Sequence, residues 1–308
     1  MGPGLIIISG ATGFIGRALF RDLSESGYDI AVLTRDREKA RAQFGDGAII
    51  AEWNGKTSHG WLELTSRAST IINLAGENIG AGRWTEQRKQ RIVQSRIDAG
   101  KAVVEAIQKA AVKPKTVIQA SAVGYYGPKN DESLDESSPP GEGFLAETVR
   151  HWELSTQGVE DIGVRRIVIR SGLVLGKDGG TLPRFLKPFR FFVGGPLGAG
   201  KQWFPWIHWK DEIAAIRFLL EREDASGVFN LVSPCSLTMK EFAKTLGRVL
   251  ERPSWFPVPA FLLRLLFGEM AGETLLSGQR VLPAALLRAG YKFRYPEIES
   301  ALRDILGA

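Results

Sequence analysis

The chain has 308 residues, with 40 Lys and Arg against 34 Asp and Glu, which gives a net charge of +6 near neutral pH. Hydrophobic residues make up 44% of the chain and charged residues 24%, which is ordinary for a globular protein. This composition excludes a disordered or fibrous chain. The basic excess is small, and no run of Lys or Arg dominates any segment, so we expect no nucleic-acid partner.

Cysteine usage and apolar segments bear on the compartment. Cys235 is the one cysteine, and a single thiol forms no internal disulfide, which favours a reducing compartment. The N-terminal residues enter the apolar run at Leu5 without a basic leader or a transit-type stretch. The most apolar stretch, residues 255–267, is shorter than the roughly 18 residues that a spanning helix needs. We therefore expect a cytoplasmic protein without a membrane span.

Short runs rich in β-branched residues alternate with helical patterns through the first half of the chain. The runs are continuously apolar, which is typical of parallel strands buried on both faces. The predicted strands cover residues 5–9, 30–34, 48–51, 70–75, 117–120 and 166–169. Between them lie helical patterns, such as Ile15, Leu19 and Leu23, and a long segment over residues 84–111. This repetition predicts an α/β fold with a Rossmann-type doubly wound parallel sheet.

After about Gly172 the sequence becomes rich in glycine, proline and aromatic residues. A helix that contains Ile213 and a short strand over residues 228–232 follow, and the remainder is helical, with prolines and no strand alternation. We infer a second, smaller and mainly helical lobe. The boundaries that we expect are 1–172 and 207–232 for the NADP-binding Rossmann domain, and 173–206 and 233–308 for the substrate lobe.

A glycine pattern lies between the first predicted strand and the first predicted helix. Gly10 permits a tight turn, Gly13 lets a pyrophosphate approach the backbone, and Gly16 allows close packing of the helix on the strand. The N-terminus of the helix supplies N–H donors and a positive dipole. The alternative is a tight turn with structural glycines. The residues that we expect to bind the cofactor here are Gly10, Thr12, Gly13, Phe14, Ile15 and Gly16.

The end of the second strand bears on the choice between NAD and NADP. Arg35 lies 19 residues beyond Gly16, where an NAD site places an acidic residue for the ribose 2′-hydroxyl. An arginine instead suits a 2′-phosphate. Thr34 and Arg35 therefore favour NADP(H). Asp36 is evidence for NAD, and a solvated loop charge is the alternative for Arg35.

The fourth predicted strand closes with Leu74, Ala75 and Gly76, which are small enough for the backbone to line a cofactor crevice. The alternative is a plain turn at the end of a strand. The next helix carries many charges, most of which we interpret as a solvated face. Arg96 is the one that we expect to reach a phosphate of the cofactor.

Eight short motifs, taken in order, resemble a known family. They cover residues 10–16, 73–78, 84–86, 121–127, 136–141, 170–176, 194–198 and 206–208. The ordered set resembles the SulA-like "epimerase family" of atypical extended short-chain dehydrogenase/reductases, and the likeness runs from Leu5 to about Leu306. The resemblance implies a Rossmann fold that binds NADP(H), with a C-terminal substrate lobe. The cell-division and epimerase labels of this family are given by similarity, so neither settles the function.

The sequence departs from the pattern of typical relatives. Those carry a Ser or Thr at the end of the fifth strand, and on the next helix a Tyr with a Lys four residues later for proton transfer. Here that helix, residues 144–153, has neither Tyr nor Lys, and Ala122 takes the usual serine position, beside Ser121. Tyr125 and Lys129 have the spacing of the pair, but Gly127 and Pro128 lie between them, so they do not share a helix face.

We take Tyr125 and Ser121 as candidate catalytic residues, because both come at the carboxyl edge of the fifth strand, where open α/β sheets bind ligands. We also expect Ser121 to contact the cofactor. Glu147 or His151 on the following helix would be an alternative acid or base. The competing interpretation is that Tyr125 and Tyr126 are packing aromatic residues with polar tips.

Residues 195–201 match the first part of a P-loop, but Gln202 stands where a Ser or Thr would bind magnesium, so we reject that interpretation. The aromatic and polar residues that follow are typical of a small-molecule pocket, and core packing is the alternative. The residues that we expect to contact substrate are Tyr125, Arg170, Gln202, Trp206 and His208. With three His, one Cys and no pairs at ligand spacing, we expect no metal site.

The leading hypothesis is an NADP(H)-dependent oxidoreductase or epimerase-like enzyme that acts on a small molecule. The missing Tyr–Lys pair favours the alternative, a non-catalytic NADP(H)-binding sensor or regulatory protein. A third hypothesis, a partner-binding scaffold that uses residues 255–267, ranks lower, because we expect this segment to complete the core of the small lobe. The expected partners are a small-molecule substrate and a second copy of the chain in a homodimer.

Overall fold

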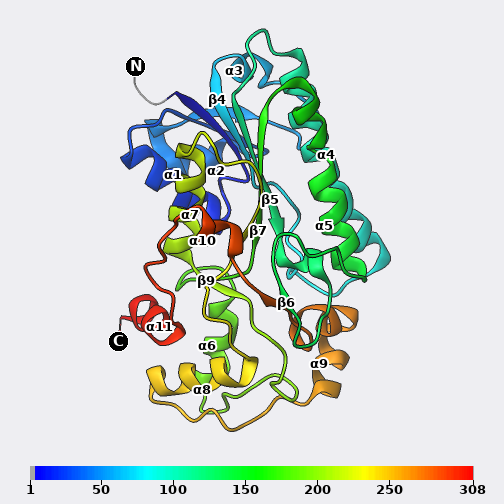
Figure 1. Ribbon diagram of the computed structural model, residues 1–308, viewed down its shortest axis with the longest axis vertical. Helices are drawn as coiled ribbons and strands as arrows, with labels where there is room; N and C mark the ends of the chain where they lie inside the picture. Colours follow the sequence, from blue (N-terminus) through cyan, green and yellow to red (C-terminus); the bar gives the residue numbers. More distant parts are fainter. Residues whose placement is uncertain (1–3, 308) are drawn as a thin grey trace.

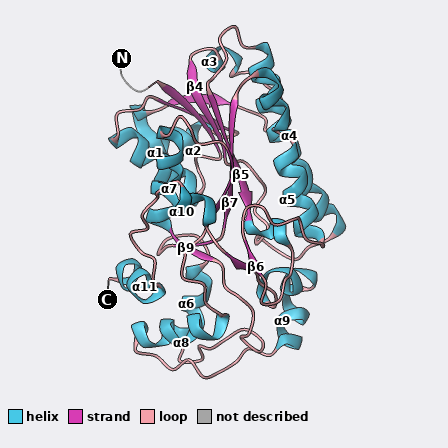
Figure 2. Cartoon of the chain, viewed as in Figure 1, coloured by secondary structure: helices cyan, strands magenta, loops and turns pink. Residues whose placement is uncertain are grey.

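A seven-stranded parallel sheet lies at the centre of the computed structural model, which describes residues 4–307 (Figures 1 and 2). Its strands are β1 (Leu5–Ser9), β2 (Ile30–Thr34), β3 (Ile49–Glu52), β4 (Ala68–Asn73), β5 (Thr116–Ala122), β7 (Arg165–Ser171) and β10 (Gly227–Leu231). In the strand order β10-β7-β5-β4-β1-β2-β3, the chain builds the sheet outward from β1 to β3 and then from β4 to β10 on the other side. The switch point of this order lies between β1 and β4. Such a switch point opens a crevice at the carboxyl ends of the strands. The predicted Rossmann-type fold is confirmed.

Helices cover both faces of the sheet (Figure 1). Ile6 and Ile8 of β1 pack with α1 (Phe14–Glu25), α2 (Arg37–Phe44) and α7 (Trp209–Glu221) in one core cluster. Leu5 and Ile7 face the other way and pack with α4 (Glu86–Lys109). The strand residues are therefore apolar at consecutive positions because both faces are buried. The remaining helices of this half are α3 (Leu62–Thr65), α5 (Phe144–Leu154), η1 (Gly45–Gly47), η2 (Val123–Tyr126) and η3 (Gln157–Ile162).

The strands and the long helix predicted in the first half lie within two residues of those observed. The predicted strand over residues 70–75 starts and ends two residues earlier, as β4, and the predicted helix over residues 84–111 is two residues shorter at each end, as α4. Thr85 caps α4 by accepting a hydrogen bond from the backbone N–H of Arg88. This cap fixes the start of the helix.

The smaller lobe is mainly helical and lies at the lower end of the view in Figure 1. Its helices are α6 (Leu182–Arg190), α8 (Met239–Leu250), α9 (Ala260–Phe267), η4 (Ala271–Leu275) and α11 (Ile298–Leu306). Helix α10 (Ala284–Arg288), expected in the lobe, instead packs beside α7 on the sheet, with Leu286 in the first core cluster. Two parallel pairs join it to the sheet region: β8 (Leu173–Leu175) with β9 (Trp206–His208), and β6 (Ser133–Leu134) with β11 (Arg280–Val281). The sequence predicted no strand near β11, because two residues carry no periodicity. No helix in the described part of the chain is long and apolar enough to cross a membrane.

The two carboxyl groups at the start of α7 are buried where the lobe meets the sheet. Asp211 accepts hydrogen bonds from the backbone N–H groups of Arg294 and Tyr295, each at 2.8 Å, and so ties the C-terminal segment to α7. Glu212 accepts a hydrogen bond from the Ser171 hydroxyl at 2.6 Å, while its Oε2 atom has no partner among residues 4–307. Burial raises the pKa of Glu212 to about 8.

This buried carboxyl predicts a pH-dependent stability. The unfolded chain releases the Glu212 proton near pH 4.5, and the folded chain holds it to about pH 8, so the contribution of this group is complete below pH 4.5 and declines as the pH rises to 8. Glu212→Gln keeps an acceptor for Ser171 and removes the ionisation. We expect the free energy of unfolding of this variant, relative to the parent, to increase across that interval in urea titrations. Parallel pH profiles of the two proteins would contradict the assignment.

Candidate functional site

The turn between β1 and α1 has the backbone geometry that a dinucleotide site needs. Gly10 has a φ of +71°, and a Cβ there would lie 2.8 Å from the carbonyl group of Leu74. A Cβ at Gly16 would overlap the Gly10 carbonyl, so the helix packs tightly on the strand. Gly13 is exposed and directly precedes α1, and among the described residues no side chain caps this helix. The N–H groups at its start are therefore available to an anionic ligand.

The other residues of this turn differ in exposure. Thr12 is half-buried, and Phe14 and Ile15 pack against the first core cluster. The Phe14 ring lies directly against the loop that follows β8, because a Cβ at Gly176 or Gly179 would overlap it. The lobe thus begins in contact with the glycine turn.

The end of β2 distinguishes the roles of its charged residues. Asp36 caps α2, since its carboxylate accepts a hydrogen bond from the backbone N–H of Lys39 at 3.0 Å. The Thr34 hydroxyl accepts one from the backbone N–H of Asp36. Arg35 is exposed and forms no hydrogen bond or ion pair with another residue in the range 4–307. The carboxylate that favoured NAD in the sequence therefore has a structural role, and the guanidinium of Arg35 is free.

A buried row of polar side chains crosses the sheet below the crevice. The Ser9 hydroxyl donates to Asn73 Oδ1 at 2.6 Å, and the Asn73 amide donates to Gln119 Oε1 at 2.9 Å. These three residues come from the neighbouring strands β1, β4 and β5, and all are fully buried. The row fixes the mutual register of the three strands that border the crevice. Our sequence predictions did not include it.

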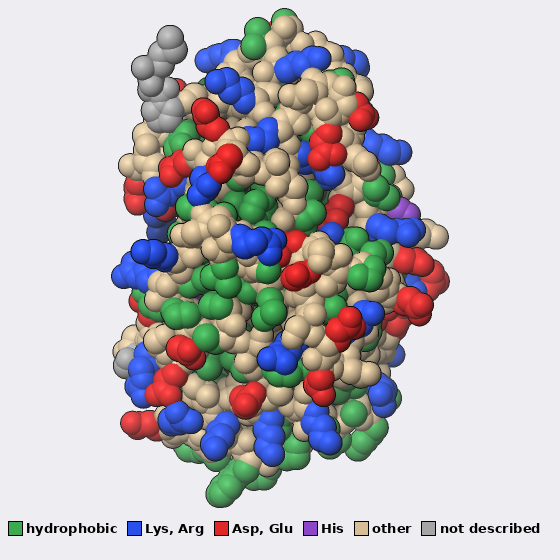
Figure 3. Space-filling view, in the orientation of Figure 1, with side chains coloured by type: hydrophobic (Ala, Val, Ile, Leu, Met, Phe, Trp, Pro, Cys, Tyr) green, Lys and Arg blue, Asp and Glu red, His purple; other side chains and the backbone are tan. Residues whose placement is uncertain are grey.

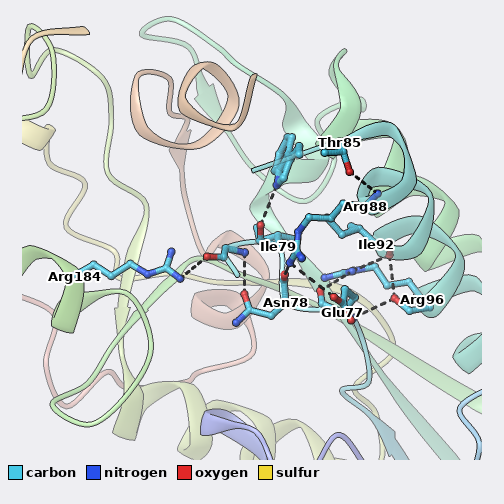
Figure 4. Close-up of polar contacts among 11 residues, drawn as sticks. Glu77, Asn78, Ile79, Thr85, Arg88, Ile92, Arg96 and Arg184 are labelled. Atoms are coloured by element: carbon cyan, nitrogen blue, oxygen red, sulfur yellow. Dashed lines mark hydrogen bonds and ion pairs between the residues drawn. The ribbon is translucent and has the colours of Figure 1, made fainter. Parts of the chain in front are cut away.

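Arginines from two helices hold the loop that follows β4 (Figure 4). Arg96 donates to the carbonyl oxygens of Glu77 at 3.1 Å and Ile92 at 2.9 Å, and its guanidinium lies 4.8 Å above the Trp152 ring. A Cβ at Gly76 would be 3.1 Å from Arg96 Cζ, so Gly76 allows this close approach. Burial lowers the pKa of Arg96 to about 10. These contacts indicate that Arg96 positions the loop, which differs from the phosphate contact that we expected.

Further along, the loop is braced from both sides of the crevice. Arg88 of α4 donates to the Asn78 carbonyl at 2.6 Å, and the Trp84 indole donates to the Ile79 carbonyl at 2.9 Å. From α6 in the lobe, Arg184 donates to the Gly80 carbonyl at 2.8 Å (Figure 4). Residues of the sheet domain and of the lobe therefore both form hydrogen bonds to this loop beside the crevice.

A buried ion pair lies at the carboxyl end of β5. Glu153 of α5 accepts two hydrogen bonds from the Arg170 guanidinium, at 2.7 and 2.9 Å, and one from the Ser121 hydroxyl at 2.5 Å. Arg170, which is 3% exposed, also donates to the Tyr126 hydroxyl at 3.0 Å, and that hydroxyl donates to Asn230 at 2.8 Å. Burial raises the pKa of Tyr126 to about 12, so this phenol stays neutral. The sequence analysis ended the predicted strand at residue 169 and took Arg170 as a substrate contact, and it did not identify Glu153 as its partner.

Tyr125 is the group of this cluster that keeps its polar atom free. The Arg170 guanidinium lies 3.4 Å from the centroid of the Tyr125 ring, and the Tyr126 ring meets it edge to face. Its side chain is half-buried, and its hydroxyl makes no hydrogen bond within the described residues. Tyr126 is thus the packing aromatic residue of the pair, and Tyr125 presents a phenol held in place by a cation. The Ser121 hydroxyl, in contrast, is buried against Glu153.

The helix that carries the Tyr–Lys pair in typical relatives presents apolar side chains instead. Leu145 and Val149 face the end of β5, within 3.6 and 3.8 Å of a Cβ placed at Gly124. Glu147 and His151 are exposed to solvent. These two residues, considered as an alternative acid or base, do not lie with Tyr125 at the strand edge.

Three of the five expected substrate residues are buried: Arg170 in the ion pair with Glu153, and Trp206 and His208 in the core. Trp206 is 1% exposed and packs in the third core cluster. His208 is fully buried: its Nδ1 atom accepts a hydrogen bond from the backbone N–H of Lys210, and its ring stacks on Tyr295. Burial lowers the pKa of His208 to about 4, although Nε2 lies 3.2 Å from Asp304 Oδ2, without the alignment of a hydrogen bond. Both positions fit the core-packing alternative rather than contact with substrate.

Gln202 also has a structural role. Its amide donates to the carbonyl oxygens of Leu197 at 3.0 Å and Leu275 at 2.7 Å, which joins two segments of the lobe. Of the expected substrate residues, the structure brings together Tyr125 and Arg170. Within residues 4–307, no three His, Cys, Asp or Glu side chains gather in a way that could hold a metal ion.

The buried pair predicts a large loss of stability on truncation. Glu153→Ala leaves the Arg170 guanidinium buried without a carboxylate, so we expect the free energy of unfolding to fall by about 3–5 kcal/mol. Glu160→Ala is the matched control, because it removes the partly exposed partner of Arg166, and its effect should stay below about 1 kcal/mol. Chemical denaturation of both variants measures the difference. Equal losses would show that the buried pair contributes no more than a surface pair.

Comparison with known proteins agrees with this architecture. Residues 6–231 match the model of the NAD dependent epimerase/dehydratase family, and residues 258–305 match a domain of unknown function, DUF1731. The chain is similar to the Epimerase family protein YfhF of Bacillus subtilis, with 39% identity over 302 residues that span 98% of this chain and 97% of the relative. It is also similar to the Epimerase family protein SDR39U1 of Homo sapiens, with 36% identity over 98% of this chain and 99% of the relative.

Solved structures show the same likeness. A crystal structure of human SDR39U1 (isoform 2) with NADPH has a TM-score of 0.87 and 35% identity, and covers 98% of this chain and 99% of that one. A UDP-glucose 4-epimerase from Thermotoga maritima has a TM-score of 0.80 over 98% of this chain and 97% of that chain, at 17% identity. The latter likeness concerns the fold alone.

Proposed function

Since the chain belongs to the NAD dependent epimerase/dehydratase family, we propose that it binds NADP(H) and acts as an oxidoreductase or epimerase-like enzyme on a small molecule. The membership expected from the eight ordered motifs is confirmed. The observation that carries the cofactor proposal is the uncapped, open start of α1 at Gly13, with the unpaired Arg35 at the end of the neighbouring strand. The human relative, whose crystal structure contains NADPH, supports the same cofactor.

The residues of the crevice fit the parts of this cofactor. The N–H groups after Gly13 would hold the pyrophosphate, and Arg35 would pair with the 2′-phosphate. The backbone from Leu74 to Gly76, held by Arg96, would line the crevice. When bound, the nicotinamide would supply hydride transfer. Thr12, Phe14, Ile15 and Thr34 remain proposed cofactor contacts around this core.

The preference for NADPH over NADH tests the role of Arg35. In Arg35→Ala the charge-assisted bond to the 2′-phosphate is lost, so we expect this preference to fall by about 1.5–3 kcal/mol. Arg41→Ala, also exposed but on α2, is the matched control and should keep the preference. Titration calorimetry with both nucleotides gives the affinities. Equal affinity of the parent for NADPH and NADH would refute the proposal.

For proton transfer we propose Tyr125. Its phenol lies at the carboxyl edge of β5, where a ligand in the crevice would lie, and it is the one hydroxyl of the buried cluster that has no other partner in the described part of the chain. Arg170, fixed by Glu153, holds the ring. The Ser121 hydroxyl would take part in proton transfer only if substrate replaced Glu153 as the acceptor of its hydrogen bond. A small-molecule substrate, a cytoplasmic location and a homodimer are parts of this proposal that follow from the sequence.

Tyr125→Phe keeps the ring and removes the hydroxyl. We expect this variant to bind NADPH as the parent does and to lose about 10²-fold or more in turnover, as the loss of general acid–base help implies. The assay follows stereospecific hydride or deuteride transfer from NADPH to a panel of carbonyl compounds and sugar nucleotides. Tyr28→Phe, on the loop after α1, is the control. Full activity of Tyr125→Phe would rule out Tyr125 as the proton donor.

A second candidate function rests on α5, which presents Leu145 and Val149 where typical relatives carry a Tyr–Lys pair. This observation favours a non-catalytic NADP(H)-binding sensor or regulatory protein. Tight NADPH binding by the parent, with no turnover of any member of the panel, would support the sensor over the enzyme.

A further inference from the structure

The end of the lobe exposes a cluster of large apolar side chains, which we call the apolar tip. Of the twelve large hydrophobic side chains that are exposed in the described part of the chain, eight belong to it. They are Phe191, Phe192, Val193, Trp255, Phe256, Phe261, Leu265 and Leu266. Trp255 is 75% exposed and Phe191 77%. Figure 3 shows hydrophobic side chains gathered at the lower end of the molecule, with a row of Lys and Arg side chains just above them.

Backbone contacts join the segments of the apolar tip into one surface. The backbone N–H of Phe256 donates to the Gly194 carbonyl at 3.2 Å, so the segment after α6 runs beside the segment before α9. The Trp255 and Phe256 rings meet edge to face, and the Arg252 guanidinium lies 4.5 Å above the Phe192 ring. Pro259 then leads directly into α9, which adds the remaining apolar side chains.

The exposure of α9 corrects the sequence-based expectation that this segment completes the core of the lobe. Of the eight residues of α9, Leu263 is the one fully buried, while Phe261 and Leu265, four residues apart, face outward on one side of the helix. Large contiguous apolar patches are rare on free protein surfaces and mark sites of contact. We therefore expect the apolar tip to contact another molecule.

Charge around the apolar tip indicates what it contacts. Residues 184–193 and 248–268 contain six Lys or Arg and a single acidic residue, Glu251, which is +5 of the net charge of +6. Four of the cations, Lys187, Arg190, Arg252 and Arg264, are exposed and form no ion pair with a carboxylate within residues 4–307. A second copy would bring the same positive charge against this one, which disfavours a homodimer through this surface.

We propose that the apolar tip docks the protein on the surface of an anionic lipid bilayer. Exposed Trp, Phe and Leu side chains with a rim of Lys and Arg match the two layers of such a surface, since the aromatic and aliphatic groups enter the headgroup region and the cations meet the lipid phosphates. The contact is peripheral, and α9, with eight residues, lies on the bilayer. The adjacent cluster of prolines, from Pro253 to Pro259, gives the inserted loop a stiff backbone.

Binding of the full chain to vesicles tests the proposal. We expect the protein to float with vesicles of phosphatidylcholine that contain about one third phosphatidylglycerol, to bind pure phosphatidylcholine far more weakly, and to dissociate at high salt. Lys187→Gln with Arg190→Gln should weaken binding roughly 30-fold, because each cation near an anionic surface contributes about fivefold. Trp255→Ala with Phe261→Ala should weaken it by at least about tenfold through the lost apolar contact.

Matched controls come from the opposite end of the molecule. Val112→Ala and Lys113→Gln change exposed residues of the loop between α4 and β5. The first removes apolar surface and the second removes a positive charge, both far from the apolar tip, so each should leave vesicle binding unchanged. All substituted residues are exposed, and thermal unfolding should be the same for every variant. Absence of binding to anionic vesicles, equal weakening by the controls, or a dimer in sedimentation velocity that the Trp255→Ala with Phe261→Ala variant abolishes would each overturn the proposal.

Discussion

The Arg170–Glu153 pair is the contact on which the arrangement of this site depends. A guanidinium buried near the carboxyl end of a parallel strand is stable only with a carboxylate and further hydrogen-bond acceptors around it. Glu153 supplies the carboxylate from α5, and the Tyr126 hydroxyl supplies a further acceptor from the turn after β5. One buried charge thus fixes the position of a strand, a helix and a turn that are distant in sequence.

The same pair explains why the site differs from that of typical relatives. Near the end of α5, Glu153 forms the ion pair with Arg170. The Ser121 hydroxyl donates a hydrogen bond to the same carboxylate. At the positions near those of the usual proton-transfer groups, Ser121 and Glu153 therefore form hydrogen bonds within the buried cluster. What is left accessible at the strand edge is the Tyr125 phenol, whose ring the cation fixes from one side. Tyr125 is for this reason the residue that we propose for proton transfer, whereas the neighbouring Tyr126 is buried.

Features that depend on neighbouring residues could be predicted from the sequence, and features that depend on distant residues could not. The strands, the long helix α4 and the turn at Gly10 follow from local periodicity and from a glycine that must adopt a positive φ. The partner of Arg170 and the burial of His208 depend on residues far along the chain, because Glu153 and Tyr295 reach them only in the folded state. Dense aromatic sequence is equally compatible with a pocket and with a core, and packing decides between them.

Helix α6 connects the cofactor crevice with the apolar tip. At its first turn Arg184 donates to the Gly80 carbonyl of the loop beside the crevice, and at its last turn Lys187 and Arg190 border the apolar tip. Six residues of helix span about 9 Å, so the two surfaces are separated by less than two turns of one helix. Pro188 lacks the backbone N–H that the helix would use, but its position near the C-terminal end leaves the first turn intact. The helix that borders the apolar tip is therefore the same one that holds the loop beside the crevice.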